Sequence, residues 1–335
     1  FCFVLCIGGA FAALLAGGYL PEHGIDRSEF FPLLLLSTVG AMALAASGDL
    51  LSLFIALETM SLGVYCMVGL RRSPRAAEAA LKYFLLGSFA AALMLFGAAL
   101  LYGATGHTDL QGIGEGIRTI GEPQSTVPVA PVLVALVLTL AGLAFKVSAV
   151  PFHMWTPDAY EGAPTPATSF MAVAVKAAAF AVLLRVLMVA FGDARLMSWG
   201  SGWPPALATL TVLTMTVANV VAGRQSSVKR MLAYSSIAHA GYALLGVVAC
   251  MRSEDGQASV LFYLLTYTVS TAGAFGALIA CGRRGAEATS YEDLSGLAKR
   301  HPGAALAFSV FLLSLAGLPP TAGFFGKLYV FRAAM

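Results

Sequence analysis

Four lysines and one glutamate stand inside stretches that are otherwise almost entirely apolar. Lys146, Lys176 and Lys327 each have apolar residues on both sides, and Lys82 lies nearer the start of its stretch. Glu58, in "LFIALETMSLGVY", is the most deeply placed carboxylate. A lysine at the centre of a membrane helix costs about 2.5 to 3.5 kcal/mol, so each is a candidate functional residue. Because an apolar interior favours the neutral amine, a buried lysine can exchange protons near neutral pH. We therefore expect a proton-transfer function.

The composition is that of a membrane protein. The chain has 335 residues, of which 59% are hydrophobic and 11% charged, against about 25% charged in soluble domains. Apolar stretches recur along its length, and about 20 residues of helix span a bilayer. The net charge of +3 is too small to indicate a nucleic-acid partner. The fold class is therefore an all-α polytopic membrane protein in contact with the lipid bilayer.

Ten spans are expected between the polar breaks. They lie at about residues 1–20, 30–47, 50–70, 76–103, 127–161, 165–191, 205–223, 229–250, 258–281 and 303–335. The fifth and tenth are too long for one plain helix, and they contain Pro151 and the pair Pro319 and Pro320. Proline removes a backbone donor and clashes with the preceding turn. Both spans are predicted to be broken helices.

Lysine and arginine residues counted on alternate sides of the spans predict the orientation. One side would carry eleven: Arg27, Arg71, Arg72, Arg75, Arg224, Lys229, Arg230, Arg283, Arg284, Lys299 and Arg300. The other would carry three: Arg118, Arg195 and Arg252. Short cytoplasmic loops are enriched in lysine and arginine, so the first side is predicted to be cytoplasmic.

The two breaks indicate an internal repeat. Five crossings separate them, and this odd number means that the two units run in opposite directions, as in transporters built from inverted repeats. We expect a peripheral helix and loop at 1–27, a first five-helix repeat at 28–203 and a truncated second repeat at 204–335. Because the chain begins and stops within apolar runs, we expect a fragment whose last helices are missing.

Each predicted break has a lysine beside it. Lys146 precedes Pro151 by five residues, and Lys327 follows Pro320 by seven. A broken helix frees backbone groups, which are tolerated at membrane depth only where protein or internal water satisfies them. We therefore expect internal water close to both lysines.

Other polar features admit simpler interpretations. His153 and His239 lie within spans and titrate near neutral pH, so each is either a relay residue or a hydrogen-bonded core residue. The five cysteines form no CxxC pair, which favours buried apolar roles over an iron–sulfur centre or a disulfide framework. The stretch "GIGEGIR" at 112–118 follows no strand, which argues against a dinucleotide site.

Four strings in the sequence resemble a known family. They are "AEAALKYFLLGSFAAALMLFGAALLYGATG", "FKVSAVPFHMWTPDAYEGAPTPATSFMAVAVKAAAF", "SSVKRMLAYSSIAHAGYALLG" and "FLLSLAGLPPTAGFFGKLYVF". They are similar to the antiporter-like membrane subunits of proton-pumping NADH:quinone oxidoreductase, respiratory complex I. The resemblance covers essentially the whole chain and is closest to the subunit N branch. It implies inverted five-helix repeats with two broken helices.

The resemblance also implies roles for individual residues. Glu58 matches the family's intramembrane acid, and Lys146 matches the lysine beside the first break. Lys176 matches the central lysine, and Lys327 the lysine that faces the exit half-channel. The possible relay positions are Lys82, His153 and His239. A lysine at 327, where a sister subunit carries glutamate, favours the subunit N branch.

The implied protein is a non-redox subunit of a translocase in the bacterial inner membrane. No cofactor or metal is expected in this chain, because NADH, FMN, iron–sulfur clusters and quinone would belong to partner subunits. Those partners would be other membrane-arm subunits, including neighbouring antiporter-like and small membrane subunits.

Two alternatives stay open. One is a subunit of a multi-subunit sodium/proton antiporter or of a membrane-bound hydrogenase, which share the lysines and broken helices. The other is a scaffold whose buried charges only fix helix packing.

Overall fold

A computed structural model describes residues 1–25, 28–120, 122, 125, 127–200, 202–253, 255–282 and 285–335. The described residues form helices and two isolated antiparallel bridges, which confirms the all-α class. Of the residues used to predict orientation, Arg27, Arg283 and Arg284 lie outside the described residues.

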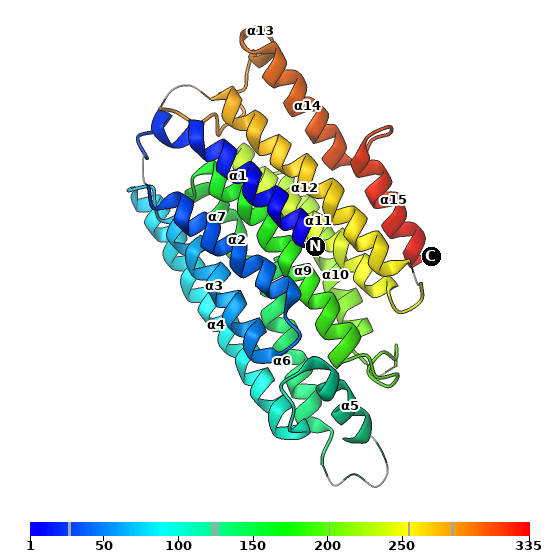
Figure 1. Cartoon of the computed structure of the whole chain (residues 1–335). Coiled ribbons are helices and arrows are strands. Elements are labelled where there is room, and N and C mark those ends of the chain that lie inside the picture. Colours follow the sequence, from blue (N-terminus) through cyan, green and yellow to red (C-terminus); the bar gives the residue numbers. More distant parts are fainter. Residues whose placement is uncertain are drawn as a thin grey trace.

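The helices run alongside one another in an elongated bundle (Figure 1). Their bounds are α1 (Cys2–Glu22), α2 (Phe30–Ala46), α3 (Leu50–Val68), α4 (Pro74–Thr105), α5 (Leu110–Ile120), α6 (Ala130–Val147), α7 (Trp155–Gly162), α8 (Thr165–Phe170), α9 (Lys176–Arg185), α10 (Pro204–Ala222), α11 (Val228–Ala249), α12 (Gly256–Cys281), α13 (Leu297–Arg300), α14 (Pro302–Ala316) and α15 (Ala322–Ala334). Two π-helical segments, η1 (Met171–Val175) and η2 (Val186–Ala190), join α8 to α9 and extend α9.

Each expected span corresponds to a helix or a pair of helices. Within the described ranges, eight helices are long and apolar enough to cross a membrane. They are Cys2–Glu22, Leu50–Val68, Pro74–Thr105, Ala130–Val147, Thr165–Ala190, Pro204–Ala222, Val228–Ala249 and Gly256–Cys281. Two further apolar helices, Phe30–Ala46 and Pro302–Ala316, are shorter. The chain is therefore a multi-pass membrane protein, as predicted.

The fifth and tenth spans are broken as expected, and the two breaks have the same local structure. α6 ends at Ser148 with φ 64°, and α14 ends at Gly317 with φ 81°. After each, the next amide bonds back five residues, from Ala149 to the Ala144 carbonyl and from Leu318 to the Leu313 carbonyl. This pattern is a Schellman cap, in which a left-handed residue closes the helix. Shared cap geometry supports the predicted repeat, whose boundaries stay a prediction.

Two features of the fold differ from the sequence interpretation. The connection after α4 contains α5, a short amphipathic helix that packs against η2. Lys229, counted among the basic residues of the cytoplasmic side, stands at the start of α11, as the expected span at 229–250 has it, but its side chain is fully buried. Ser227 caps α11 by accepting a hydrogen bond from the Arg230 amide, so the helix begins just before this basic pair.

Contacts between loop residues support the predicted sides of the membrane. The Arg71 guanidinium lies 2.9 Å from Glu287, so the connection after α3 and the one after α12 share an end. Arg195 donates to the Arg118 carbonyl at 3.1 Å, which places these two at the other end. Figure 1 shows α13 and α5 at opposite ends of the bundle.

Close helix packing positions the first break. A Cβ added to Gly142 of α6 would lie 2.9 Å from the Ala90 carbonyl oxygen of α4. Small residues at such crossings let the backbones of membrane helices approach. The α4–α6 contact fixes the helix whose end carries Lys146.

We expect Gly142→Leu to destabilise the protein by about 1 to 3 kcal/mol, because the added side chain must push α4 and α6 apart. The thermal unfolding midpoint of the solubilised complex measures this. Gly103→Leu, also in a membrane helix but with open space around the glycine, serves as the matched control. Equal midpoints for the two variants would contradict the prediction.

Candidate proton-transfer site

The first break places Lys146 in a buried environment of hydroxyl groups and aromatic rings. Its side chain lies one residue before the end of α6 and is only 2% exposed. The ammonium donates to the Ser61 hydroxyl at 2.6 Å and to the Tyr65 hydroxyl at 3.4 Å, both on α3. It also lies 5.4 Å from the centre of the Tyr65 ring and 5.8 Å from that of Tyr83. Aromatic ring faces attract a desolvated cation, so these groups stabilise the charged form without fixing it.

Glu58 lies one turn before Ser61 on α3 and makes no direct ion pair with Lys146. Among the described residues, no salt bridge within 4.0 Å joins the two side chains. Its Oε1 atom is buried and has no hydrogen-bond partner within the described chain. The Ser61 hydroxyl accepts from Lys146 and donates to the Leu57 carbonyl. The carboxylate and the ammonium are thus neighbouring but separate sites.

Lys176 is held by α11. It is the first residue after the η1 segment and is 2% exposed. Its ammonium donates to the Ser236 carbonyl at 2.5 Å and to the Ser236 hydroxyl at 2.6 Å. The same hydroxyl accepts from Tyr267 of α12 at 2.8 Å and lies 3.3 Å from the Tyr160 hydroxyl of α7. Ser236 therefore connects the central lysine with the second half of the first broken helix.

His239 lies one turn beyond Ser236 on α11. Its Nδ1 atom is 2.5 Å from the Tyr263 hydroxyl of α12. The imidazole centre also lies 5.1 Å from that of the Tyr267 ring. Tyr267 therefore contacts both the Ser236 hydroxyl that holds Lys176 and the ring of this histidine.

Lys327 occupies the second break. Its ammonium donates to the carbonyls of Leu315 and Ala316 at 2.9 and 3.0 Å, which are among the last carbonyls of α14. It also lies 4.8 Å from the centre of the Tyr242 ring. The helix break therefore supplies hydrogen-bond acceptors for the lysine beside it. The ammonium in turn satisfies backbone carbonyls that the break leaves unpaired, which membrane depth requires.

Within the described residues, no hydrogen bond or ion pair joins Lys82 or His153 to Lys146, Lys176 or Lys327. The Lys82 side chain is 47% exposed and forms ion pairs with Glu78 at 2.7 Å and Asp158 at 3.0 Å. Arg230 also binds Asp158, at 2.8 Å. His153 lies in the first break, where its Nδ1 atom is buried without a hydrogen-bond partner in the described residues. Lys82 thus belongs to a solvent-accessible ion cluster, whereas His153 retains a free ring nitrogen.

The sequence interpretation missed the hydroxyl groups that hold the lysines. Ser61, Tyr65, Tyr160, Ser236 and Tyr267 lie within apolar helices, and each supplies a contact to a lysine or to its partner. Ser61 follows Glu58 by three residues, and Ser236 precedes His239 by three. Because residues three apart share a helix face, that spacing was the available signal.

A metal site is not indicated in the ranges that the structure describes. No group of three or more histidine, cysteine, aspartate or glutamate side chains there could hold a metal ion. The chemistry that this arrangement supports is proton exchange between amines, a carboxylate, hydroxyls and imidazoles.

Comparison with known proteins identifies related chains. Residues 47–335 match the family model described as "NADH:quinone oxidoreductase/Mrp antiporter, TM". NADH-quinone oxidoreductase subunit N 1 of Sorangium cellulosum is 73% identical over 100% of this chain. The chain spans 66% of the length of that relative.

Solved structures have the same fold. A chain of respiratory complex I from Thermus thermophilus has a TM-score of 0.77 and 42% identity, covering 99% of this chain and 69% of that one. A chain of the Mrp complex from Dietzia sp. has a TM-score of 0.83 and 27% identity, covering 99% of this chain and 60% of that one.

Proposed function

Because the chain belongs to the family of NADH:quinone oxidoreductase and Mrp antiporter membrane subunits, we propose that it is a subunit N-type component of an NADH:quinone oxidoreductase and translocates protons. The family relationship confirms the resemblance that the sequence motifs carry. Within the family, the 73% identity to a subunit N relative, against 27% to the Mrp chain, supports this assignment over a sodium/proton antiporter.

The observation that carries the proposal is a set of three ammonium groups within the bundle, of which those of Lys146 and Lys176 are buried and that of Lys327 is half-buried. Lys146 and Lys327 lie at helix breaks, and Lys176, which stands between them in the sequence, donates to the Ser236 hydroxyl. A buried ammonium is costly unless it is paired or solvated, and these lysines are held by neutral oxygens and ring faces. Neutral partners let each amine alternate between charged and uncharged forms, so each can take up and release a proton.

In this proposal the chain performs no redox chemistry. NADH oxidation and quinone reduction take place in partner subunits of the membrane complex, which hold the flavin and the iron–sulfur clusters. Moving one charge against 100 mV costs about 2.3 kcal/mol, so the driving force must come from those reactions. The chain's own task is to bind, hold and release protons at Glu58, Lys146, Lys176 and Lys327.

We expect Glu58→Gln to lower NADH-driven proton uptake into inverted membrane vesicles about tenfold or more, since an acid–base group contributes about 10²- to 10⁴-fold. The amide keeps the side-chain volume and removes a buried charge, so assembly should persist. Glu115→Gln, at an exposed position of α5, is the control. Normal uptake by assembled Glu58→Gln complex would remove Glu58 from the proton route.

Sodium/proton antiport is the second candidate, favoured by the structural similarity to the Mrp complex. It predicts that sodium ions drive proton movement in vesicles without NADH. We expect no such exchange, and the measurement uses a pH-sensitive dye after a sodium pulse. Genes for flavin and iron–sulfur subunits beside this one would favour the oxidoreductase.

A further inference from the structure

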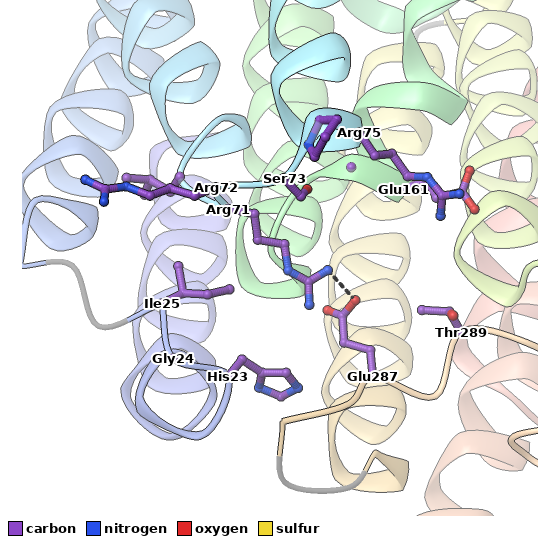
Figure 2. A pocket seen from close by; sticks show the side chains of 13 residues that line it. His23, Gly24, Ile25, Arg71, Arg72, Ser73, Arg75, Glu161, Glu287 and Thr289 are labelled. Carbon is purple, nitrogen blue, oxygen red and sulfur yellow. Dashed lines mark hydrogen bonds and ion pairs between the residues drawn. The ribbon is translucent and has the colours of Figure 1, made fainter.

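Glu287 lies in the connection between α12 and α13, yet four other segments hold its carboxylate. Its side chain is 9% exposed. It accepts hydrogen bonds from the Tyr19 hydroxyl of α1, from Arg71 at 2.9 Å and from the Thr165 hydroxyl of α8 at 2.5 Å. The Lys229 ammonium of α11 lies 3.5 Å away. Figure 2 shows the Arg71 side chain pointing directly at this carboxylate, whereas Arg72 points away.

The charge on Glu287 is permanent at neutral pH. Burial would raise the pKa of its carboxyl, but Lys229, Arg71 and the hydrogen bonds from Thr165 and Tyr19 hold that pKa at about 2. Because this pKa is below the ordinary 4.5, the ionised carboxylate stabilises the folded state fully above pH 4.5. This contribution to folding is lost as the pH falls toward 2. The carboxylate therefore remains a fixed negative charge in the cell.

Lys229 extends this contact to the first broken helix. Its side chain is 0% exposed, and its ammonium also donates to the Ala163 carbonyl at 2.8 Å. Ala163 is the C-terminal cap of α7, the second half of that helix. One buried ammonium thus joins the cytoplasmic end of α7 to Glu287.

The segment that carries Glu287 also leads to the second broken helix. The Val228 amide donates to the Thr289 carbonyl at 2.7 Å, which fastens the segment to the start of α11. Ala288 packs in a small apolar cluster with Leu297 and Ala304, the latter in the first turns of α14. Glu287 therefore stands between the cytoplasmic ends of the two broken helices.

We propose that Glu287 is a positioning residue that ties the cytoplasmic end of α7 to the segment entering α14, so that the two broken helices move together. Stability alone would not require this arrangement, because apolar residues often replace a buried ion pair at no loss. Four donors from four segments instead specify one relative placement. A cavity of about 780 Å³, lined in part by Arg71, Glu161 and Glu287, leaves room for the segment to shift once released.

The first test measures whether Glu287 holds the end of α7 and the segment entering α14 together, and it does not depend on transport. Glu287→Gln is compared with Glu292→Gln, an exposed carboxylate on the same connection, in the assembled membrane complex. We expect amide hydrogen exchange at 163–168 and 286–290 to accelerate about tenfold in Glu287→Gln alone, because loss of the tie favours local opening. Unchanged exchange would overturn the proposal.

The second test addresses the consequence for transport, which rests on the proposed function. We expect Glu287→Gln to lower the number of protons moved per NADH oxidised by about half, with Glu292→Gln unchanged. If amide hydrogen exchange accelerates but the number of protons moved per NADH is unchanged, the contact is merely structural and the proposal is overturned. If the proposed function fails, the ratio will instead be insensitive to Glu58→Gln as well, while the exchange result stands.

If Glu287→Gln fails to assemble, a double variant still tests the proposal. Lys229→Met with Glu287→Gln removes both buried charges, so assembly should recover. We expect the low proton ratio to persist in this double variant, because the link to Ala163 is also lost. Recovery of the normal ratio along with assembly would overturn the proposal.

Discussion

Replacing Lys146 with methionine should lower NADH-driven proton uptake into inverted vesicles about 100-fold or more, since the variant loses a buried acid–base group. Methionine fills a similar volume but binds no proton. The hydroxyls of Ser61 and Tyr65 would remain, yet neither replaces an amine that alternates between two charge states. Quinone reduction should slow as well, because a coupled complex stalls when one step is blocked.

The same variant separates catalysis from stability. Exchanging a buried charge for an apolar side chain of similar volume is often neutral or stabilising, so the Lys146→Met complex should assemble. Lys299→Met, at an exposed position in α13 on the side predicted to be cytoplasmic, is the control and should pump normally.

Lys146→Arg decides between proton transfer and a scaffold role. Arginine keeps the positive charge but does not deprotonate in proteins. A proton relay therefore requires that Lys146→Arg be nearly as defective as Lys146→Met. If the arginine variant pumps normally and only the methionine variant fails, charge alone matters and the scaffold interpretation holds.

The membrane spans and breaks could be predicted because both depend on local sequence. About 20 apolar residues fill a bilayer, and the prolines near 151 and 319 exclude continuous helices. Proximity along the chain also placed Lys146 and Lys327 beside those breaks. Helix α5 was missed because its glycine-rich, partly polar sequence has no span-length apolar run.

The partners of the charged groups could not be predicted, because they come from distant segments. Lys176 meets Ser236 across 60 residues of sequence, and Lys229 meets Glu287 across the whole of α11 and α12. Lys229 was counted among the basic residues of the cytoplasmic side because it stands in a basic run at a helix start. Only packing shows that it is turned inward toward Ala163.

The two breaks place a lysine differently, which suggests that their roles are not equivalent. Lys146 precedes its break and turns toward hydroxyls of α3, whereas Lys327 follows its break and turns back onto freed carbonyls. Carbonyls accept hydrogen bonds but cannot donate them. The second break thus favours the charged amine more strictly than the first, where hydroxyls can reverse direction.

Gly317→Val should lower proton uptake about fivefold or more, by disturbing the second break. Gly317 has φ 81°, in the left-handed region where a non-glycine residue costs about 1 to 2 kcal/mol and a β-branched one more. Such a cost changes an equilibrium about 5- to 30-fold. A Cβ there would also lie 2.9 Å from Cδ of Lys327. The substitution therefore displaces the lysine from the carbonyls that hold it.

Gly303→Val, in the same helix but with open space around the glycine, is the matched control and should pump normally. If the defect of Gly317→Val acts through Lys327, adding Lys327→Met to it should lower proton uptake no further than Lys327→Met alone. Variants that share one partner in this way are non-additive. Fully additive losses of proton uptake would mean that Gly317 supports transport by another route. That result would contradict the inference that the cap of α14 acts through Lys327.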